Sequence, residues 1–277
     1  MRKFVVAAAI AAASLSSTAT FAQAPQPKTA RPAAAKPSAA KPSAAKPSAA
    51  QPVALPAART IIDRHIKAIG GRTAILAYTS TRATGTLTVP GPGMSGTFEM
   101  LAAKPNKMML RISLSGIGEI IDGFDGTNGW SLSPITGPAL SQGKELEQKK
   151  FDSDFLGDLH DPSRYESIKT VEQTTFDGRP CYKISLVRKG GDEDFEFYDV
   201  ATGLKAGGTG SRETPMGAIT ATETRGEYKK FGKLLQPTLL KQSAMGIEQV
   251  LTITTLEYDT VAPAAFEPPA AIKALIK

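Results

Sequence analysis

The sequence predicts a mainly β domain, with one strongly curved antiparallel sheet of about twelve strands folded around two or three helices. Hydrophobicity alternates with a period of two over most of the chain after residue 80, as in strands with one buried face. Short turn sequences separate these runs, which favours consecutive antiparallel strands. Only two or three segments have a helical pattern, too few for an α/β fold. A closed barrel or a sandwich is the alternative architecture.

The chain begins with the pattern of an export signal. Arg2 and Lys3 precede ten apolar residues, Phe4 to Ala13, a run too short to span a bilayer. Small residues follow, and we expect a signal peptide over 1–22. No Cys near the cleavage site offers a lipid anchor, and no later apolar run is long enough for a transmembrane segment. We therefore expect a soluble periplasmic protein.

Residues 23–57 are rich in Ala, Pro, Lys and Ser, and Lys-Pro-Ser-Ala-Ala occurs three times within 36–50. We expect a disordered linker, with a cationic arm that touches the anionic envelope as the alternative. Residues 1–57 contain seven of the 33 Lys and Arg and none of the 26 Asp and Glu, so 58–277 has 26 of each. The formal charge of +7 therefore comes from residues 1–57. The predicted domain, 58–277, lacks the excess of basic residues that is typical of nucleic-acid-binding domains, so we expect no nucleic-acid partner.

Two segments of the domain are predicted to be helical, with a short extra turn over 72–77. The first spans Arg59–Ile69 and ends at Gly70-Gly71, because residues just past a helix end often need a positive φ. Its apolar stripe contains Ile61, Ile62, His65, Ile66 and Ile69. The second, over 141–156, is rich in helix formers and has no β-branched residue.

The remaining segments have the pattern of strands. The clearest is 107–114, and the hairpin signals are Asp125-Gly126 and Asp177-Gly178. We expect strands at 83–89, 97–102, 107–114, 117–124, 127–132, 165–175, 181–188, 193–199, 204–213, 217–229, 234–243 and 247–258.

Residues with catalytic or metal-binding chemistry are scarce. The single Cys181 excludes an intramolecular disulfide and a Cys-based zinc site, and His160-Asp161 has no evident nucleophile to activate. The acidic run 152–158 lacks the bidentate ligand of a calcium loop, and 192–194 is predicted to be a charged turn. The glycines of 207–210 indicate a bend or bulge. We expect no cofactor, no metal and no enzymatic activity.

Several short motifs resemble the bacterial outer-membrane lipoprotein-sorting carriers (LolA/LolB-like), in an uncharacterised exported branch, over about 58–269. They are Ala68-Ile69-Gly70-Gly71-Arg72, Gly116-Ile117-Gly118-Glu119, Gly123-Phe124-Asp125-Gly126-Thr127-Asn128-Gly129-Trp130, Phe176-Asp177-Gly178-Arg179-Pro180-Cys181-Tyr182, Phe197-Tyr198-Asp199-Val200-Ala201-Thr202-Gly203-Leu204, Pro215-Met216-Gly217, Glu227-Tyr228 and Gly232-Lys233-Leu234-Leu235-Gln236-Pro237. These are mainly turn and hairpin motifs, so the resemblance bears on fold more than on activity.

The resemblance implies an open half-barrel whose concave apolar face is covered by helices and accepts acyl chains. The expected function is that of a non-enzymatic carrier or sensor, with a lipid or an acylated protein as partner. The alternative is an interaction module of an envelope protein complex, since some relatives of this branch are attached to pitrilysin-type zinc peptidases. The pitrilysin zinc motif is absent here, so the resemblance implies no peptidase activity.

The candidate lining of such a cavity consists of apolar side chains on strands and on the first helix. These equally fit a filled core. They are Met100, Met108, Leu110, Ile112, Leu114, Trp130, Phe195 and Phe197 on the sheet, with Ile62, Ile66 and Ile69 on the helix side.

Overall fold

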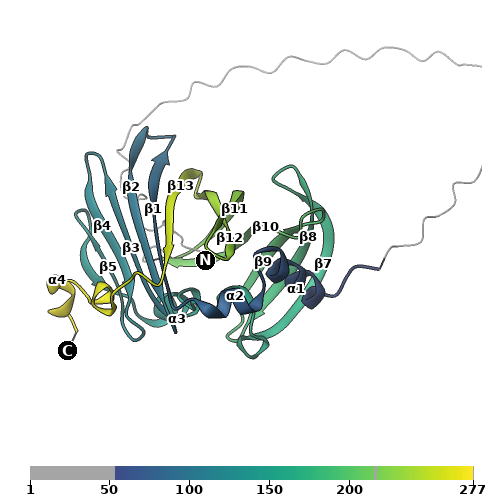
Figure 1. Cartoon of the computed structure of the whole chain (residues 1–277). Helices are drawn as coiled ribbons and strands as arrows, with labels where there is room; N and C mark the ends of the chain where they lie inside the picture. The colour runs from purple at the N-terminus through teal and green to yellow at the C-terminus, as the bar shows by residue number, and fades with distance from the viewer. Residues whose placement is uncertain (1–53, 215–216, 277) are drawn as a thin grey trace, which may run out of the picture. The chain divides into compact units, whose positions relative to one another are not determined.

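The computed structural model describes residues 54–214 and 217–276. The predicted signal peptide, 1–22, and most of the predicted linker, 23–57, lie outside the described residues. The described part forms one domain in which a single antiparallel sheet dominates and short helices lie on both of its faces (Figure 1). The mainly β fold class is confirmed.

The sheet has thirteen strands. They are β1 (Ser80–Val89), β2 (Met94–Ala103), β3 (Lys107–Leu114), β4 (Gly118–Phe124), β5 (Gly129–Ser133), β6 (Gly137–Leu140), β7 (Tyr165–Phe176), β8 (Arg179–Arg188), β9 (Glu193–Asp199), β10 (Lys205–Thr214), β11 (Gly217–Phe231), β12 (Leu234–Ala244) and β13 (Ile247–Tyr258). The α-helices are α1 (Ala58–Ala68), α2 (Arg72–Ala77), α3 (Gly143–Asp152) and α4 (Ala270–Lys273), and the 3₁₀ turns are η2 (Gly157–Leu159), η3 (Pro162–Arg164) and η4 (Pro263–Phe266).

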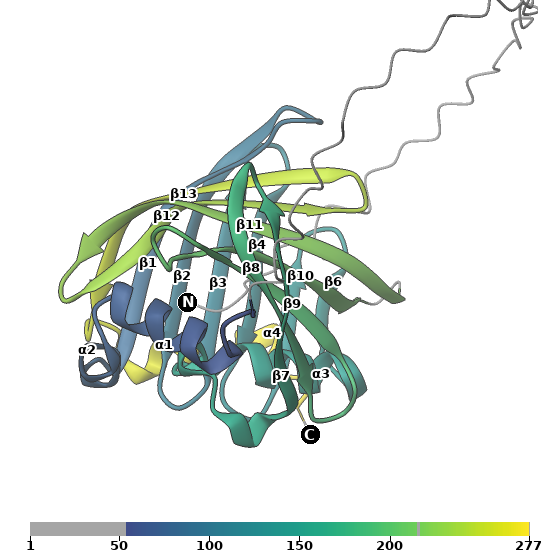
Figure 2. The ribbon, with the colours of Figure 1, turned by 90° about the vertical axis from the view of Figure 1, so that its right-hand side faces the viewer.

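The strand order explains why the sheet is open. It runs β6-β5-β4-β3-β2-β1-β13-β12-β11-β10-β9-β8-β7, so β1 and β13 are the only neighbours that do not follow each other in sequence. Strands β6 and β7 are the two free edges. This is a meander of short hairpins, as predicted, and not a closed barrel or a sandwich. The sheet curves strongly (Figure 2).

The local predictions are confirmed with two corrections. Asp125-Gly126 and Asp177-Gly178 connect β4 to β5 and β7 to β8, and Asp177 and Gly178 both have positive φ, as a type I′ turn requires. The extra strand is β6, whose four residues are too few to show alternation. The helix predicted over 141–156 ends at Asp152, where Ser153 Oγ donates to Lys149 O.

The two faces of the sheet have different covers. We call the face that α1 and α3 contact the inner face, and the other the outer face. Helix α1 packs its isoleucine stripe against β7–β9, where Tyr198 meets His65 edge-on at 5.3 Å between ring centroids. On the outer face, Phe266 of η4 and Ile272 of α4 pack against β2–β5. Figure 1 shows α1 and α4 on opposite sides of the sheet.

Candidate functional site

An apolar cluster lies on the inner face of six neighbouring strands, β12, β13 and β1 to β4. We call it the inner apolar cluster, and it contains Ala83, Leu87, Val89, Phe98, Met100, Leu110, Ile112, Leu114, Ile120, Leu240, Leu251, Ile253 and Leu256. Four predicted lining residues are members: Met100, Leu110, Ile112 and Leu114. All thirteen come from strands, so within the described residues no helix contributes to this cluster.

The other predicted inner residues lie beside this cluster. Met108 is on the same face of β3 and borders a small cavity of about 50 Å³ with Ile69 and Tyr258. Ile62, Ile66 and Ile69 belong to a second cluster, between α1 and strands β7–β9. Ile62 and Ile66 therefore lie between α1 and the β7–β9 end of the sheet, whereas Ile69, just past the end of α1, also borders Met108 of β3.

Three predicted lining residues lie on the outer face. Trp130 packs with Leu101, Met109 and Phe266. Phe195 and Phe197 pack with Cys181 and Ala206, and Phe197 stacks on Phe176 at 4.0 Å between ring centroids. Successive side chains of a strand point to opposite faces of the sheet. A prediction that takes the wrong alternate set as inward-facing therefore assigns every residue of that set to the wrong face.

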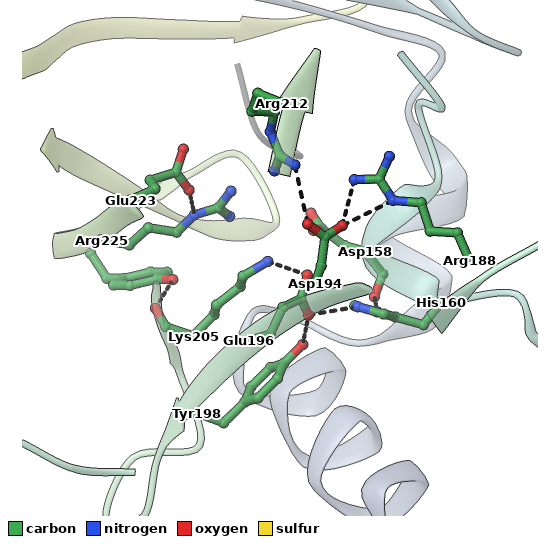
Figure 3. Close-up of polar contacts among 11 residues, drawn as sticks. Asp158, His160, Arg188, Asp194, Glu196, Tyr198, Lys205, Arg212, Glu223 and Arg225 are labelled. Carbon is green, nitrogen blue, oxygen red and sulfur yellow. Dashed lines mark hydrogen bonds and ion pairs between the residues drawn. The ribbon is translucent and has the colours of Figure 1, made fainter. Parts of the chain in front are cut away.

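The inner face of β9–β11 is charged, which the sequence analysis missed. The six residues of this charged stripe are Asp194 and Glu196 of β9, Lys205 and Arg212 of β10, and Glu223 and Arg225 of β11, and all are buried (Figure 3). The prediction that 192–194 is a charged turn is wrong for Glu193 and Asp194, which both lie within β9. Isolated buried charges are costly, so each needs a partner.

Asp194 accepts hydrogen bonds from two arginines. Arg188 Nε lies 2.9 Å from Asp194 Oδ2, and Arg212 Nη1 lies 3.1 Å from Oδ1. The carboxylate can cross β10 because Gly210 leaves it room: a Cβ there would lie 1.7 Å from Asp194 Oδ1. The glycines of 207–210 thus lie in β10, where the pairing with β9 shifts at a bulge, as the sequence indicated.

Within the described part of the chain, Glu196 accepts hydrogen bonds from Lys205 Nζ at 2.6 Å and Tyr198 Oη at 2.6 Å, and its carboxylate lies 2.8 Å from His160 Nε2. His160 Nδ1 lies 2.9 Å from the carbonyl oxygen of Asp158, which can only accept. Nδ1 therefore donates to that carbonyl oxygen, and Nε2 is the ring nitrogen that faces the Glu196 carboxylate.

Glu223 and Arg225 form the third pair of the stripe, with Arg225 Nε 2.6 Å from Glu223 Oε1. Gln242 Nε2 also donates to Glu223, at 3.3 Å. Burial raises the pKa of the Glu223 carboxyl, but Arg225 and Lys205 outweigh it, so the pKa lies below its usual value. Burial lowers the pKa of Lys205, and Glu196 opposes that shift.

His65 is buried between α1 and Tyr198 of β9. Burial in the α1 interface lowers the pKa of His65 to about 4, with the neighbouring cations Lys205 and His160 adding to the shift. Its Nδ1 has no hydrogen-bond partner among the described residues. His65 is therefore uncharged at neutral pH.

An open depression of about 1110 Å³ leads to the charged stripe. Leu76, Phe151 and Leu159 supply apolar surface to it, and Arg59 and Arg164 are among its charged residues. Arg188 lines the depression and also donates to Asp194, so the depression reaches the stripe. This volume is slightly above the range of about 300–1,000 Å³ that is typical of small-molecule sites.

The described residues provide no group of three or more His, Cys, Asp or Glu side chains placed to bind a metal ion. In the same part of the chain, no helix combines the length and apolarity needed to cross a membrane.

No protein-family model matches the sequence, and no curated protein matches it. Solved structures do match. A DUF1329 family protein from Desulfovibrio piger aligns with a TM-score of 0.53 and 11% identity, over 76% of this chain and 97% of that one. A LolA superfamily protein from Nitrosomonas europaea gives 0.52 and 11%, over 77% and 99%. The fold is LolA-like.

A putative outer membrane lipoprotein-sorting protein domain from Vibrio parahaemolyticus aligns less well, with a TM-score of 0.46 and 11% identity, over 79% of this chain and 97% of that one. At such identities the likeness is one of fold alone. The inner apolar cluster and the charged stripe are therefore features of this chain's own residues, and the comparisons do not bear on them.

Proposed function

We propose that this protein is a periplasmic, non-enzymatic carrier or sensor that binds the acyl chains of a lipid or an acylated protein. The observation that supports it best is the inner apolar cluster, to which no helix of the described chain contributes. Burial of a hydrocarbon chain on an apolar surface stabilises the complex by about 0.8 kcal/mol per CH₂. An acyl chain can therefore bind there without a charged contact.

The proposed binding surface comprises Met100, Leu110, Ile112 and Leu114 of the original prediction, with Met108 at its border. Leu87, Phe98 and Leu251 extend it across β13, β1 and β2. The LolA-like fold supports this function as an analogy, because folds host unrelated functions.

The test uses the exported full-length protein, purified from the periplasm under mild conditions. Native mass spectrometry and organic extraction should both reveal bound lipid, and the extracted protein should bind a fluorescent fatty acid. A protein that carries no lipid and refuses the fluorescent fatty acid would contradict the proposal.

A second candidate function, an interaction module of an envelope complex, has one observation in its favour. Strand β7 is a twelve-residue edge strand, and Val171 on it is 46% exposed. An edge strand can pair with an extended segment of a partner. Two bulges in its pairing with β8, at Tyr165/Ser167 and Thr170/Glu172, oppose such pairing. A pull-down with the folded domain that captures one envelope protein and no lipid would favour this function.

A further inference from the structure

The charged stripe and the inner apolar cluster meet along one line of the sheet. Arg225 on β11 is paired in register with Leu240 on β12, and Leu240 belongs to the inner apolar cluster. Two positions along, on the same face, Glu223 is paired with Gln242. Neighbouring strands are about 4.8 Å apart. A molecule with an apolar part and a charged part can therefore lie across this line and touch both surfaces.

Three cations of the charged stripe, on β10 and β11, have hydrogen-bond donors to spare. Arg225 donates through Nε to Glu223, and its Nη1 and Nη2 donate to none of the described residues. Arg212 Nε is buried and likewise has no partner in the described chain. Lys205 Nζ, with three N–H groups, makes one described bond, to Glu196.

These spare donors suit a phosphate ester. The guanidinium group has a planar arrangement of N–H groups that matches phosphate oxygens and donates two bonds in parallel. Bonds to a charged group are stronger than neutral ones, and more so in a buried site than in water. The carboxylates of the stripe already accept hydrogen bonds from Arg188, Lys205 and Arg225. The Asp158 carboxyl also faces Arg225 and Lys205; burial raises its pKa, and these two cations lower it. The remaining N–H groups of Arg212 and Arg225 are the donors that a phosphate could use.

We propose that Arg225 and Arg212 bind the phosphodiester of a phospholipid whose acyl chains lie on the inner apolar cluster. This inference rests on the proposed function and narrows its ligand from lipids and acylated proteins in general to phospholipids. The chains contact β12, β13 and β1–β3, and the headgroup lies on β10 and β11.

The test compares ligands of equal chain length on the delipidated full-length protein, by isothermal titration calorimetry below their micellar concentrations. Dioctanoyl phosphatidylglycerol carries the phosphodiester, and dioctanoyl galactosylglycerol carries an uncharged headgroup. We expect the phospholipid to bind at least about tenfold more tightly, the effect of one or two charge-assisted hydrogen bonds. Glycerol 3-phosphate alone, and a diacylated cysteinyl peptide, are the comparison ligands, and both should bind more weakly than the phospholipid.

The variant test removes the charge pair as a unit, because deleting one partner leaves an unpaired buried charge. In Glu223→Gln/Arg225→Gln the preference for the phospholipid over the galactolipid should fall about tenfold. The matched control is Arg82→Gln/Glu99→Gln, which neutralises a partly exposed ion pair of 2.7 Å between β1 and β2, away from the charged stripe. The control should keep the preference.

The outcomes separate this inference from the proposed function. Equal affinity for the phospholipid and the galactolipid would contradict the proposed phosphate site but not the proposed carrier function. Binding of neither lipid would contradict the carrier function itself. Tighter binding of the acylated peptide, or glycerol 3-phosphate as tight as the phospholipid, would overturn the assignment to phospholipids. If the paired variant does not fold, the wild-type ligand comparison still decides.

Discussion

Lys149 Nζ on α3 lies 2.7 Å from Asp122 Oδ2 on β4, while the adjacent Gln148 Oε1 accepts from Glu213 N on β10 at 2.9 Å. Six strands separate β4 from β10 in the sheet order. Helix α3 therefore bridges the two wings of the curved sheet on its inner face. This bridge lies beside the open depression that leads to the charged stripe.

The bridge should contribute measurably to stability. In a double-mutant cycle, Lys149→Ala and Asp122→Ala should show a coupling of about 1 kcal/mol, because the Lys149 side chain is 9% exposed and also donates to Trp130 O. Urea unfolding of the four proteins measures it. The control cycle is Lys273–Glu267, an exposed pair of 2.8 Å, which should show no measurable coupling because solvent screens it. Equal coupling in both cycles would contradict a structural role for the bridge.

The glycine under Asp194 should be intolerant of a side chain. Gly210→Ala places a methyl group against the Asp194 carboxylate and should cost about 3 kcal/mol, from overpacking and a disturbed buried ion pair. Gly226→Ala is the control, since a Cβ at that strand position meets nothing within 4 Å. It should change stability by less than about 0.5 kcal/mol. Denaturant midpoints compare the two, and a tolerated Gly210→Ala would argue against the described placement of Asp194.

His65 should make the domain acid-sensitive. Its folded pKa of about 4 lies below the ordinary value of 6.5, so the neutral form is favoured in the folded state. The stabilisation is present above pH 6.5 and is lost as the pH falls toward 4, by about 2 to 3 kcal/mol at pH 4.5.

The measurement is the difference in unfolding free energy between pH 7.5 and pH 4.5, for the wild type and for His65→Leu. Carboxylates contribute equally to both proteins, so the difference between them isolates His65. A His65→Leu protein that loses as much stability as the wild type would show that His65 is not the source.

The outer face offers a fluorescence test, because Trp130 is the single tryptophan and is fully buried under Phe266. Phe266→Ala should red-shift the emission of Trp130 and cost about 3 kcal/mol. Leu275→Ala, at a site 41% exposed in the same terminal segment, should leave the spectrum unchanged. An unshifted spectrum for Phe266→Ala would contradict the packing of the C-terminal segment on β2–β5.

The strands and hairpins could be predicted from the sequence because each is encoded by a short run of consecutive residues. The alternation over 107–114 and the two Asp-Gly hairpins each need only a few consecutive residues. The pairing of β1 with β13 could not be predicted from those signals, because it joins segments about 170 residues apart and no short motif encodes it.

The charged stripe was missed for a different reason. Alternation along 193–199 separates Phe195 and Phe197 from Asp194 and Glu196 but does not say which set faces inward. Hydrophobicity alone assigns the aromatic residues to the inner face. In the structure they pack on the outer face instead, where Phe176 and Cys181 bury them. The available signal was the spacing of charges two residues apart on nearby strands, as in Asp194/Glu196 and Glu223/Arg225.

The most direct test of the account asks which face of the sheet contacts a bound acyl chain. Lipids with brominated chains quench tryptophan at short range. A tryptophan introduced as Phe98→Trp in a Trp130→Phe background lies in the inner apolar cluster, whereas the native Trp130 lies on the outer face and serves as the control. We predict strong quenching at position 98 and none at Trp130. Quenching of Trp130 with none at position 98, or quenching of neither by a lipid that binds, would contradict the central claim.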